Sequence, residues 1–181
     1  MTGFLIIIFV SVVWIACCGY FWGWGPFCKL HEKKSAGLNG NSAQYDLKNA
    51  GFCENSALKG KNIIFLGSSV TYGAASQGIS FADYICQRNG CHMIKEAVSG
   101  TTLVDDRDDS YISRLRTIRE ECADLFVCQL STNDATQKKP LGSVGDAEEI
   151  SGFDTNTVAG AIGYIIQYVT DKWHCPVVFY T

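Results

Sequence analysis

The feature that most restricts the fold is an uncharged stretch near the start of the chain, residues 2–28, most of it the apolar run FLIIIFVSVVWIACCGYFWGWGPF. A helix needs about 20 apolar residues to cross the hydrocarbon core of a membrane, so this run is long enough. Aromatic residues gather at its end, as in the belt at a membrane–water interface: Tyr20, Trp22, Trp24 and Phe27. We expect an uncleaved, single-pass transmembrane anchor over residues 1–28. The alternatives are a cleaved signal peptide, which normally carries positive charge before its apolar part, and a buried core helix.

Basic residues beside this run bear on its orientation. Lys29, Lys33 and Lys34 follow it, and no lysine or arginine precedes it. Taken literally, the positive-inside rule places the rest of the chain in the cytoplasm. Residues 29–60 are polar and rich in Ser, Asn, Gly and Lys, so we expect a tether there that leads to a folded domain.

Charge and cysteine content exclude other classes of protein. The net charge is −3 and there is no dense Lys/Arg block, so nothing predicts nucleic acid as a partner. The nine cysteines are odd in number, which argues against a fully paired disulfide framework, and they form no C-x-x-C or zinc-like spacing. We expect mostly reduced, buried thiols, with a Cys86–Cys91 bridge left open.

Residues 61–181 alternate between strand-like and helix-like patterns, with a length suited to one domain. Short apolar runs predict buried strands at 62–66, 93–98, 125–130 and 177–180. Helical spacing or composition predicts helices at 81–88, 110–121 and 157–172. Strands that alternate with helices indicate the α/β class with a parallel sheet. Ligands of such sheets bind outside the carboxyl ends of the strands, so the loops after these strands are the candidate site.

Those loops carry residues suited to acyl transfer. Ser69 follows the first strand in a Gly-Ser-Ser turn, Gly100 follows the second, and Asn133 follows the third within Ser-Thr-Asn-Asp. A serine hydroxyl can attack a carbonyl carbon, while backbone and amide N–H groups stabilise the negative oxygen that forms. Each signal alone is weak, because the first is also an ordinary turn and the third is also an Asx-turn. Their order on three successive strand ends favours the catalytic interpretation.

Together these motifs resemble the SGNH/GDSL hydrolases. Ser69 matches the nucleophile of block I, Gly100 the oxyanion glycine of block II, and Asn133 the oxyanion asparagine of block III. Two positions depart from the pattern: Ser68 stands where many members have Asp, and Ser131 replaces the Gly of Gly-x-Asn-Asp. The resemblance covers residues 61–181 and implies a flavodoxin-like three-layer parallel sheet.

The family's general base, the histidine of a C-terminal Asp-x-x-His, is the missing element. His31 lies in the tether, and His92 begins a strand at the opposite edge from Ser69. His174 ends an Asp-x-x-His sequence, but it lies between a helix end and the fourth strand, again at the amino edge of the sheet. We expect it to end that helix and interact with the helix dipole. The resemblance therefore implies that the chain is truncated, its fold incomplete at the C-terminus and the fragment inactive.

The leading hypothesis is a membrane-anchored serine esterase that needs no metal or organic cofactor. The resemblance implies small-molecule or glycan esters, such as acetylated carbohydrates, as substrates. Family members that act on envelope glycans need the orientation opposite to the one the lysines predict, and the side of the membrane stays open. The alternatives are an inactive membrane-tethered binding protein on the same fold and, less favoured, a nucleotide or signalling domain, since phosphate-binding glycine motifs are absent. The long segment 131–156 is expected to be a loop that shapes the substrate pocket or a surface excursion.

Overall fold

The computed structural model describes residues 2–31, 46–145 and 149–181. The chain divides into two units. The first contains the N-terminal helix, and the second, Asp46–Ala74 with Gly78–Thr181, contains the sheet. Residues 32–45 of the expected tether, including Lys33 and Lys34, lie outside the described residues.

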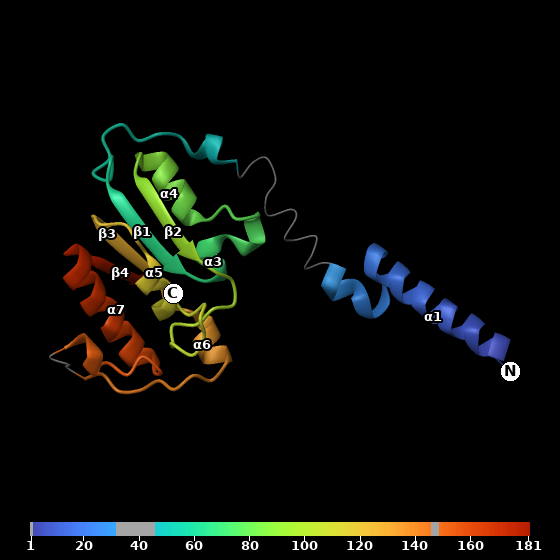
Figure 1. The fold of residues 1–181 in the computed structure, drawn as a ribbon. Coiled ribbons are helices and arrows are strands. Elements are labelled where there is room, and N and C mark those ends of the chain that lie inside the picture. The colour runs from blue at the N-terminus through green and yellow to red at the C-terminus, as the bar shows by residue number, and fades with distance from the viewer. Residues whose placement is uncertain (1, 32–45, 146–148) are drawn as a thin grey trace. The chain divides into compact units, whose positions relative to one another are not determined.

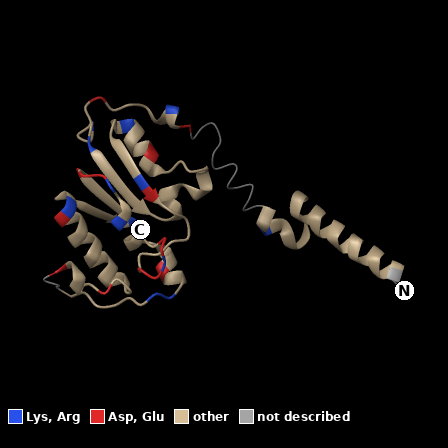
Figure 2. Ribbon diagram, viewed as in Figure 1, with Lys and Arg blue, Asp and Glu red and all other residues tan. Residues whose placement is uncertain are grey.

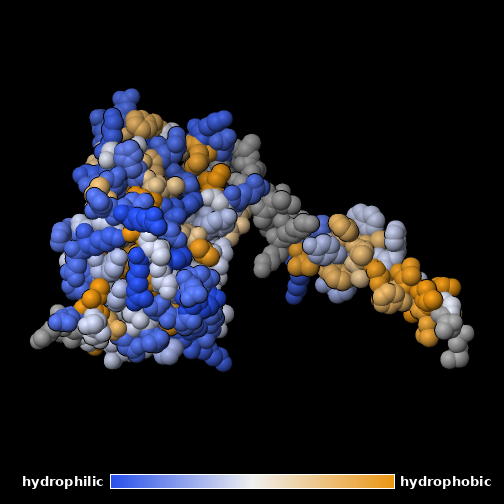
Figure 3. Space-filling model, viewed as in Figure 1, coloured by the Kyte–Doolittle hydropathy of each residue, from blue (hydrophilic) through white to orange (hydrophobic). Residues whose placement is uncertain are grey.

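The first unit is dominated by one apolar helix. Helix α1 spans Thr2–Trp22 and is followed by a short 3-10 turn, η1, at Gly25–Phe27. Figure 2 shows α1 without a charged residue, and Figure 3 shows its hydrophobic surface. The segment Gly3–His31, which contains nearly all of α1, is 29 residues long and apolar enough to cross a membrane. A signal sequence has the same length and composition, so the helix alone does not separate the two.

The second unit is built on a sheet of four parallel strands (Figure 1). They are β1 (Asn62–Gly67), β2 (His92–Ala97), β3 (Leu125–Gln129) and β4 (Val177–Tyr180), in the order β2-β1-β3-β4. The predicted α/β class with a parallel sheet is confirmed. Because all four strands run the same way, their carboxyl ends meet at one edge.

Helices cover both faces of this sheet. Alternate side chains of β1 point to opposite faces. Ile64 and Leu66 pack in the cluster that includes α5 (Tyr111–Thr117) and α7 (Val158–Trp173). Ile63 and Phe65 pack in the cluster that includes α4 (Phe81–Asn89). Each such buried side chain contributes about 1.5–3 kcal/mol to folding, so the two apolar faces fix the three-layer arrangement.

Local signals in the sequence define several helix ends. α4 begins at Ser80, whose side chain accepts from the Ala82 N–H, and Asp83 completes a capping box. α7 begins at Thr157, whose side chain accepts from the Gly160 N–H. Two one-turn helices were not predicted, α3 (Ser69–Tyr72) and α6 (Thr132–Thr136), because a single turn has no readable apolar periodicity.

Helix α5 is shorter than the predicted helix 110–121. It ends at Thr117, and Ile118 already has extended backbone angles. Hydrogen bonds from α7 replace helical hydrogen bonds at this point. The Ile118 carbonyl accepts from Lys172 Nζ at 2.5 Å, and the Glu120 carbonyl accepts from Trp173 Nε1 at 2.8 Å. Carbonyls bonded to α7 in this way do not continue a helical ladder.

Residues 46–60 lie along the C-terminal end of α4 and include the short turn η3 (Leu47–Ala50). The Cys53 N–H donates to the Arg88 carbonyl at 2.7 Å, and the Gly60 N–H donates to the Gly90 carbonyl at 2.8 Å. This half of the expected tether therefore belongs to the second unit. The predicted boundaries at residues 28 and 60 stay predictions.

All nine cysteines are free in the structure, and the Cys86–Cys91 bridge is not formed. Cys86 and Cys128 are buried, whereas Cys17, Cys28 and Cys122 are exposed. Burial raises the pKa of Cys86 to about 12, with Cys91 beside it adding to the shift. A thiol held protonated in this way is a weak nucleophile.

Candidate active site

Each predicted site residue lies in a loop at the carboxyl edge of the sheet. Ser69 is the first residue of α3 and follows β1. Gly100 lies in the loop after β2, is exposed and has a φ of 83°. Asn133 is in α6, directly after β3. The three strands are neighbours in the sheet, so the structure brings the three motifs to adjacent positions.

The Ser69 and Gly100 N–H groups are among the uncommitted backbone donors at this edge. Within the described residues, neither the Ser69 N–H nor the Gly100 N–H donates to a protein acceptor. The first turn of a helix leaves such N–H groups without intrahelical partners. These donors therefore remain for a ligand oxygen.

The Asn133 side chain is the third donor, and it is held in place. Its Nδ2 donates to the Thr101 carbonyl at 2.9 Å, which uses one of its two N–H bonds. Ser131 Oγ donates to the same carbonyl at 3.0 Å and accepts from the Asn133 N–H at 3.1 Å. Ser131 thus joins the asparagine turn to the loop of Gly100.

Asp134 anchors the same loop from the neighbouring position. Its Oδ2 accepts from the Leu103 N–H at 2.9 Å, and its Oδ1 accepts from the Val104 N–H at 3.2 Å. Burial raises the pKa of Asp134, although these two hydrogen bonds oppose the shift. Lys139 also opposes it by charge. The loop between β2 and α5 is therefore attached to the turn after β3 at Thr101 and again at Leu103 and Val104.

Arg114, in α5, donates hydrogen bonds to the ends of both β1 and β2. Its Nη2 donates to the Gly67 carbonyl at 2.9 Å and to Thr101 Oγ1 at 3.1 Å. Its Nη1 donates to the Glu96 carbonyl at 2.8 Å, and its Nε to the Asp109 carbonyl at 2.9 Å. The guanidinium is 8% exposed, and burial lowers the pKa of Arg114. One buried cation thus fixes the bases of the serine and glycine loops.

Tyr111 lies beneath these loops with its hydroxyl fully buried. That hydroxyl makes no well-formed hydrogen bond to any residue that the structure describes. Burial raises the pKa of Tyr111, and the nearby Ser68 and Ser131 hydroxyls lower it only in part. The phenol therefore stays neutral, and its ring packs under the Arg114 guanidinium, 5.1 Å from the ring centre.

Gln129, the last residue of β3, contacts the serine turn directly. Its Oε1 accepts from the Ser68 N–H at 3.1 Å, from the Thr71 N–H at 3.3 Å and from Thr71 Oγ1 at 2.8 Å. Thr71 Oγ1 also lies 2.5 Å from the Tyr180 hydroxyl at the end of β4. These contacts connect the serine turn to the ends of β3 and β4.

The two histidines of the second unit do not reach this edge. His92 is the first residue of β2, and His174 ends α7 ahead of β4, with a φ of 52°. Both lie at the amino edge, where the sequence placed them. Strands rise about 3.3 Å per residue, so a strand of this length separates the two edges by roughly 15–20 Å. His31 belongs to the first unit.

The segment 131–156 is mostly irregular, with residues 146–148 outside the described part. Its residues 141–145 and 152–154, together with α7, line a cavity of about 730 Å³. Ser69, Gly100 and Asn133 do not line this cavity. Within the described ranges, no cluster of His, Cys, Asp and Glu is suited to hold a metal ion.

The sequence did not reveal three of the positioning side chains. Arg114 carried no signal of burial in the sequence, yet it is among the most buried charged residues. Gln129 and Asp134 carried no signal as anchors, although Asp134 ends the Ser-Thr-Asn-Asp motif and Gln129 lies two residues before it. An Arg amid apolar residues of a helix is a weak hint at best, because most such residues are solvated.

No family model and no curated protein matches the chain. Among solved structures, one crystal structure is 26% identical, with a TM-score of 0.56 over 68% of this chain and 57% of its own. A protein from Lactobacillus plantarum is 23% identical, with a TM-score of 0.53 over 67% of this chain and 55% of its own. A possible lipase from Chitinophaga pinensis is 21% identical, with a TM-score of 0.50 over 66% of this chain and 47% of its own. Matches described as GDSL-like lipases, from two Bacteroides species, have TM-scores of 0.48 and 0.46.

The chain thus spans little more than half the length of the first two of these structures. The second unit of this chain, with its parallel sheet and helices on both faces, shares its α/β fold with these structures, among them the possible lipase from Chitinophaga pinensis.

Proposed function

We propose that this chain carries the nucleophile and the oxyanion-binding groups of a membrane-anchored ester hydrolase of SGNH/GDSL type. The observation that carries the proposal is the placement of Ser69, Gly100 and Asn133 on three adjacent strand ends, with hydrogen bonds between their loops. The uncommitted N–H groups of Ser69 and Gly100 and the anchored amide of Asn133 are the donors that an oxyanion site needs.

In the proposed reaction, Ser69 Oγ attacks the carbonyl carbon of an ester and gives its proton to a general base. The carbonyl oxygen becomes negative and is held by the N–H groups of Ser69 and Gly100 and by Asn133 Nδ2. The carbon–oxygen bond to the alcohol then breaks, and the alcohol leaves with a proton from the base. Water attacks the resulting acyl-serine by the same route and regenerates Ser69. Small acyl esters, such as acetylated carbohydrates, are the proposed substrates.

The base is the unassigned group of this mechanism. A base has to come within about 3 Å of the serine oxygen, and His92 and His174 are at the wrong edge. A histidine base would therefore come from outside the described residues of the second unit. The same observation favours a second candidate, a membrane-tethered binding protein that uses this fold without catalysis.

The two candidates differ in how Ser69 reacts. The test uses the full chain in detergent with p-nitrophenyl acetate, and imidazole is added as a diffusible base. Mass spectrometry then locates the acetyl group. We expect Ser69 to become acetylated in the folded protein, with Ser69→Ala unmodified at that peptide and His174→Ala equal to the parent. An unmodified Ser69 in a folded chain would leave the binding protein as the remaining candidate. Loss of the reaction in His174→Ala would show that the placement of this histidine is misread.

The anchor is tested separately. We propose that α1 stays in the membrane as an uncleaved helix, because its side chains are uncharged throughout and mostly apolar. The mass of the mature protein decides between anchor and signal peptide. An intact N-terminus and resistance to alkaline extraction are expected. A charged residue at the centre of a membrane helix opposes insertion by about 2.5–3.5 kcal/mol, so Val10→Arg should weaken retention while Val10→Leu should not.

A further inference from the structure

We infer that Gln129 is a positioning residue for Ser69, and that its single side-chain oxygen sets the conformation of the nucleophile's turn. This inference rests on the proposed function. Gln129 is the last residue of β3, so it reaches the turn from the adjacent strand rather than from the turn itself. It is 3% exposed, which keeps water from replacing its contacts.

The orientation of the amide follows from its partners. Two backbone N–H groups, those of Ser68 and Thr71, point at the same Gln129 atom. Both can only donate, so the atom that faces them has to be the oxygen of the amide and not its nitrogen. The Thr71 hydroxyl adds a third donor at 2.8 Å. One buried oxygen therefore accepts three hydrogen bonds from a turn of four residues.

The direction of the next hydrogen bond follows as well. Thr71 Oγ1 has one hydrogen, and it goes to Gln129, since the amide oxygen cannot donate. The Tyr180 hydroxyl, 2.5 Å away, must therefore donate to Thr71 Oγ1. Burial raises the pKa of Tyr180, which favours the protonated phenol that this role needs. The ends of β3 and β4 thus hold the serine turn through one chain of hydrogen bonds.

This arrangement assigns the N–H groups of the turn. Gln129 takes those of Ser68 and Thr71, on either side of Ser69. The Ser69 N–H is left without a protein acceptor among the described residues. Fixing its neighbours holds that free N–H and the Ser69 hydroxyl in one orientation, as a preorganised oxyanion site requires. Positional errors near 1 Å at a reacting group lower rates by about 10²-fold.

The test compares two Gln129 variants in the full chain in detergent. Gln129→Leu has a similar size but no acceptor, whereas Gln129→Glu keeps an oxygen for all three donors. The first readout is the imidazole-dependent rate of Ser69 acetylation against p-nitrophenyl acetate concentration. We expect the maximal rate to fall by about 10- to 100-fold in Gln129→Leu with an unchanged half-saturating concentration. Gln129→Glu should stay within a few fold of the parent.

The second readout does not depend on reactivity. Hydrogen exchange at the Ser68 and Thr71 amides should speed up in Gln129→Leu and not in Gln129→Glu. If Gln129→Leu does not fold, Thr71→Val takes its place, because it breaks the bonds of the threonine hydroxyl to Gln129 and Tyr180. It should lower the maximal rate several-fold.

The outcomes separate the two proposals. If the parent acetylates Ser69 and the acceptor-free variant reacts equally fast, the positioning role is overturned and the proposed function stands. If the parent leaves Ser69 unmodified, the proposed function fails and the role of Gln129 fails with it. Slow reaction in both Gln129 variants would also overturn the role, since the glutamate keeps the acceptor.

Discussion

Asn133 Nδ2 donates to the Thr101 carbonyl at 2.9 Å, and this bond joins the turn after β3 to the loop after β2. The proposed oxyanion donors are thereby coupled, because Thr101 is the direct neighbour of Gly100. Ser131 supports the same carbonyl at 3.0 Å, so the loop has a second attachment that does not involve the amide. Because the loop has two attachments, one of them can be removed to test its effect on the reaction rate while the other still holds the loop.

Replacing Asn133 with alanine tests that separation. The variant loses an oxyanion donor, and loss of one such donor lowers the rate by about 10²–10³-fold. The loop should remain attached through Ser131, so the free energy of unfolding should fall by only about 1 kcal/mol. Urea unfolding and the Ser69 acetylation rate are the measurements. Ser131→Ala is the control, since it removes the other bond to Thr101 but keeps the donor. Equal rate losses in both variants would contradict a direct role for the amide.

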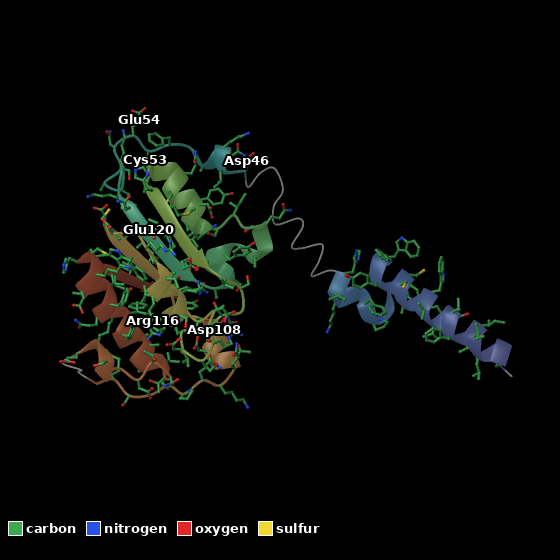
Figure 4. All side chains as sticks on the ribbon, in the orientation of Figure 1. Asp46, Cys53, Glu54, Asp108, Arg116 and Glu120 are labelled. Carbon is green, nitrogen blue, oxygen red and sulfur yellow. The ribbon has the colours of Figure 1, made fainter. Side chains whose placement is uncertain are left out.

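Arg114 should matter mainly for stability. Arg114→Met leaves the buried carbonyl of Gly67 and the partly buried carbonyls of Glu96 and Asp109 without their side-chain donor. We expect the free energy of unfolding to fall by about 2–4 kcal/mol in urea titrations. Arg116→Met is the matched control on the same helix. That side chain is 45% exposed and pairs with Asp105 at 2.8 Å, beside α7 (Figure 4), so its loss should cost about 1 kcal/mol or less. Similar losses in the two variants would show that Arg114 is not a buried clamp.

Strands and long helices were predictable because their signals are local. Short apolar runs place the four strands within about a residue of their observed ends, and the predicted helices at 81–88 and 157–172 match α4 and α7 to within a residue at each end. Because strands and helices alternate, the strands are expected to be parallel and their carboxyl ends to share one edge of the sheet. The sequence alone therefore predicts that Ser69, Gly100 and Asn133 lie at the same edge. The same reasoning placed His92 and His174 at the far edge.

Contacts between distant residues could not be predicted in this way. Arg114 is buried because carbonyls from three other segments converge on it, and no pattern within its own helix records them. Gln129 lies 61 residues from Ser68 in the chain, and a polar residue at a strand end has no signature that distinguishes an anchor from a solvated side chain. The early end of α5 has the same origin, since bonds from α7 determine it.

The pair of Lys95 and Asp83 gives a prediction for pH. Lys95 Nζ lies 2.6 Å from Asp83, with both side chains less than 20% exposed, and it also donates to the Gly78 carbonyl. Burial raises the pKa of Asp83, but hydrogen bonds from Lys95 and Ser80 outweigh it, so the pKa lies below its ordinary value of 3.8. A carboxyl whose folded pKa is depressed stabilises the fold above its unfolded pKa and loses that contribution as the pH falls through the folded one.

Lys95→Met should therefore lower the free energy of unfolding by about 2 kcal/mol at pH 7, and the difference from the parent should shrink below pH 4. Urea unfolding at pH 7 and at pH 3 measures this. Lys61→Met removes the exposed pair with Asp124 and should leave the stability nearly unchanged at either pH, because solvent screens an exposed pair. A Lys95→Met difference that stays constant down to pH 3 would rule out the ion pair as its cause.

Two glycines with left-handed backbone angles should respond differently to alanine. Gly100 has a φ of 83°, and a Cβ there would meet no atom within 4 Å. Gly73, which ends α3, has a φ of 85°, but a Cβ there would lie 2.5 Å from the Ile79 carbonyl oxygen. Gly100→Ala should therefore lower the free energy of unfolding only by the cost of backbone strain, about 1–2 kcal/mol. Gly73→Ala has the same strain and also a clash with main-chain atoms, which cannot move away as a flexible side chain could. We expect Gly73→Ala to be the more destabilised in urea.

Gly100→Ala should fold and yet acetylate Ser69 more slowly, because strain relief rotates the N–H that the oxyanion needs. A Gly100→Ala protein that reacts at the parental rate would remove this glycine from the proposed oxyanion site.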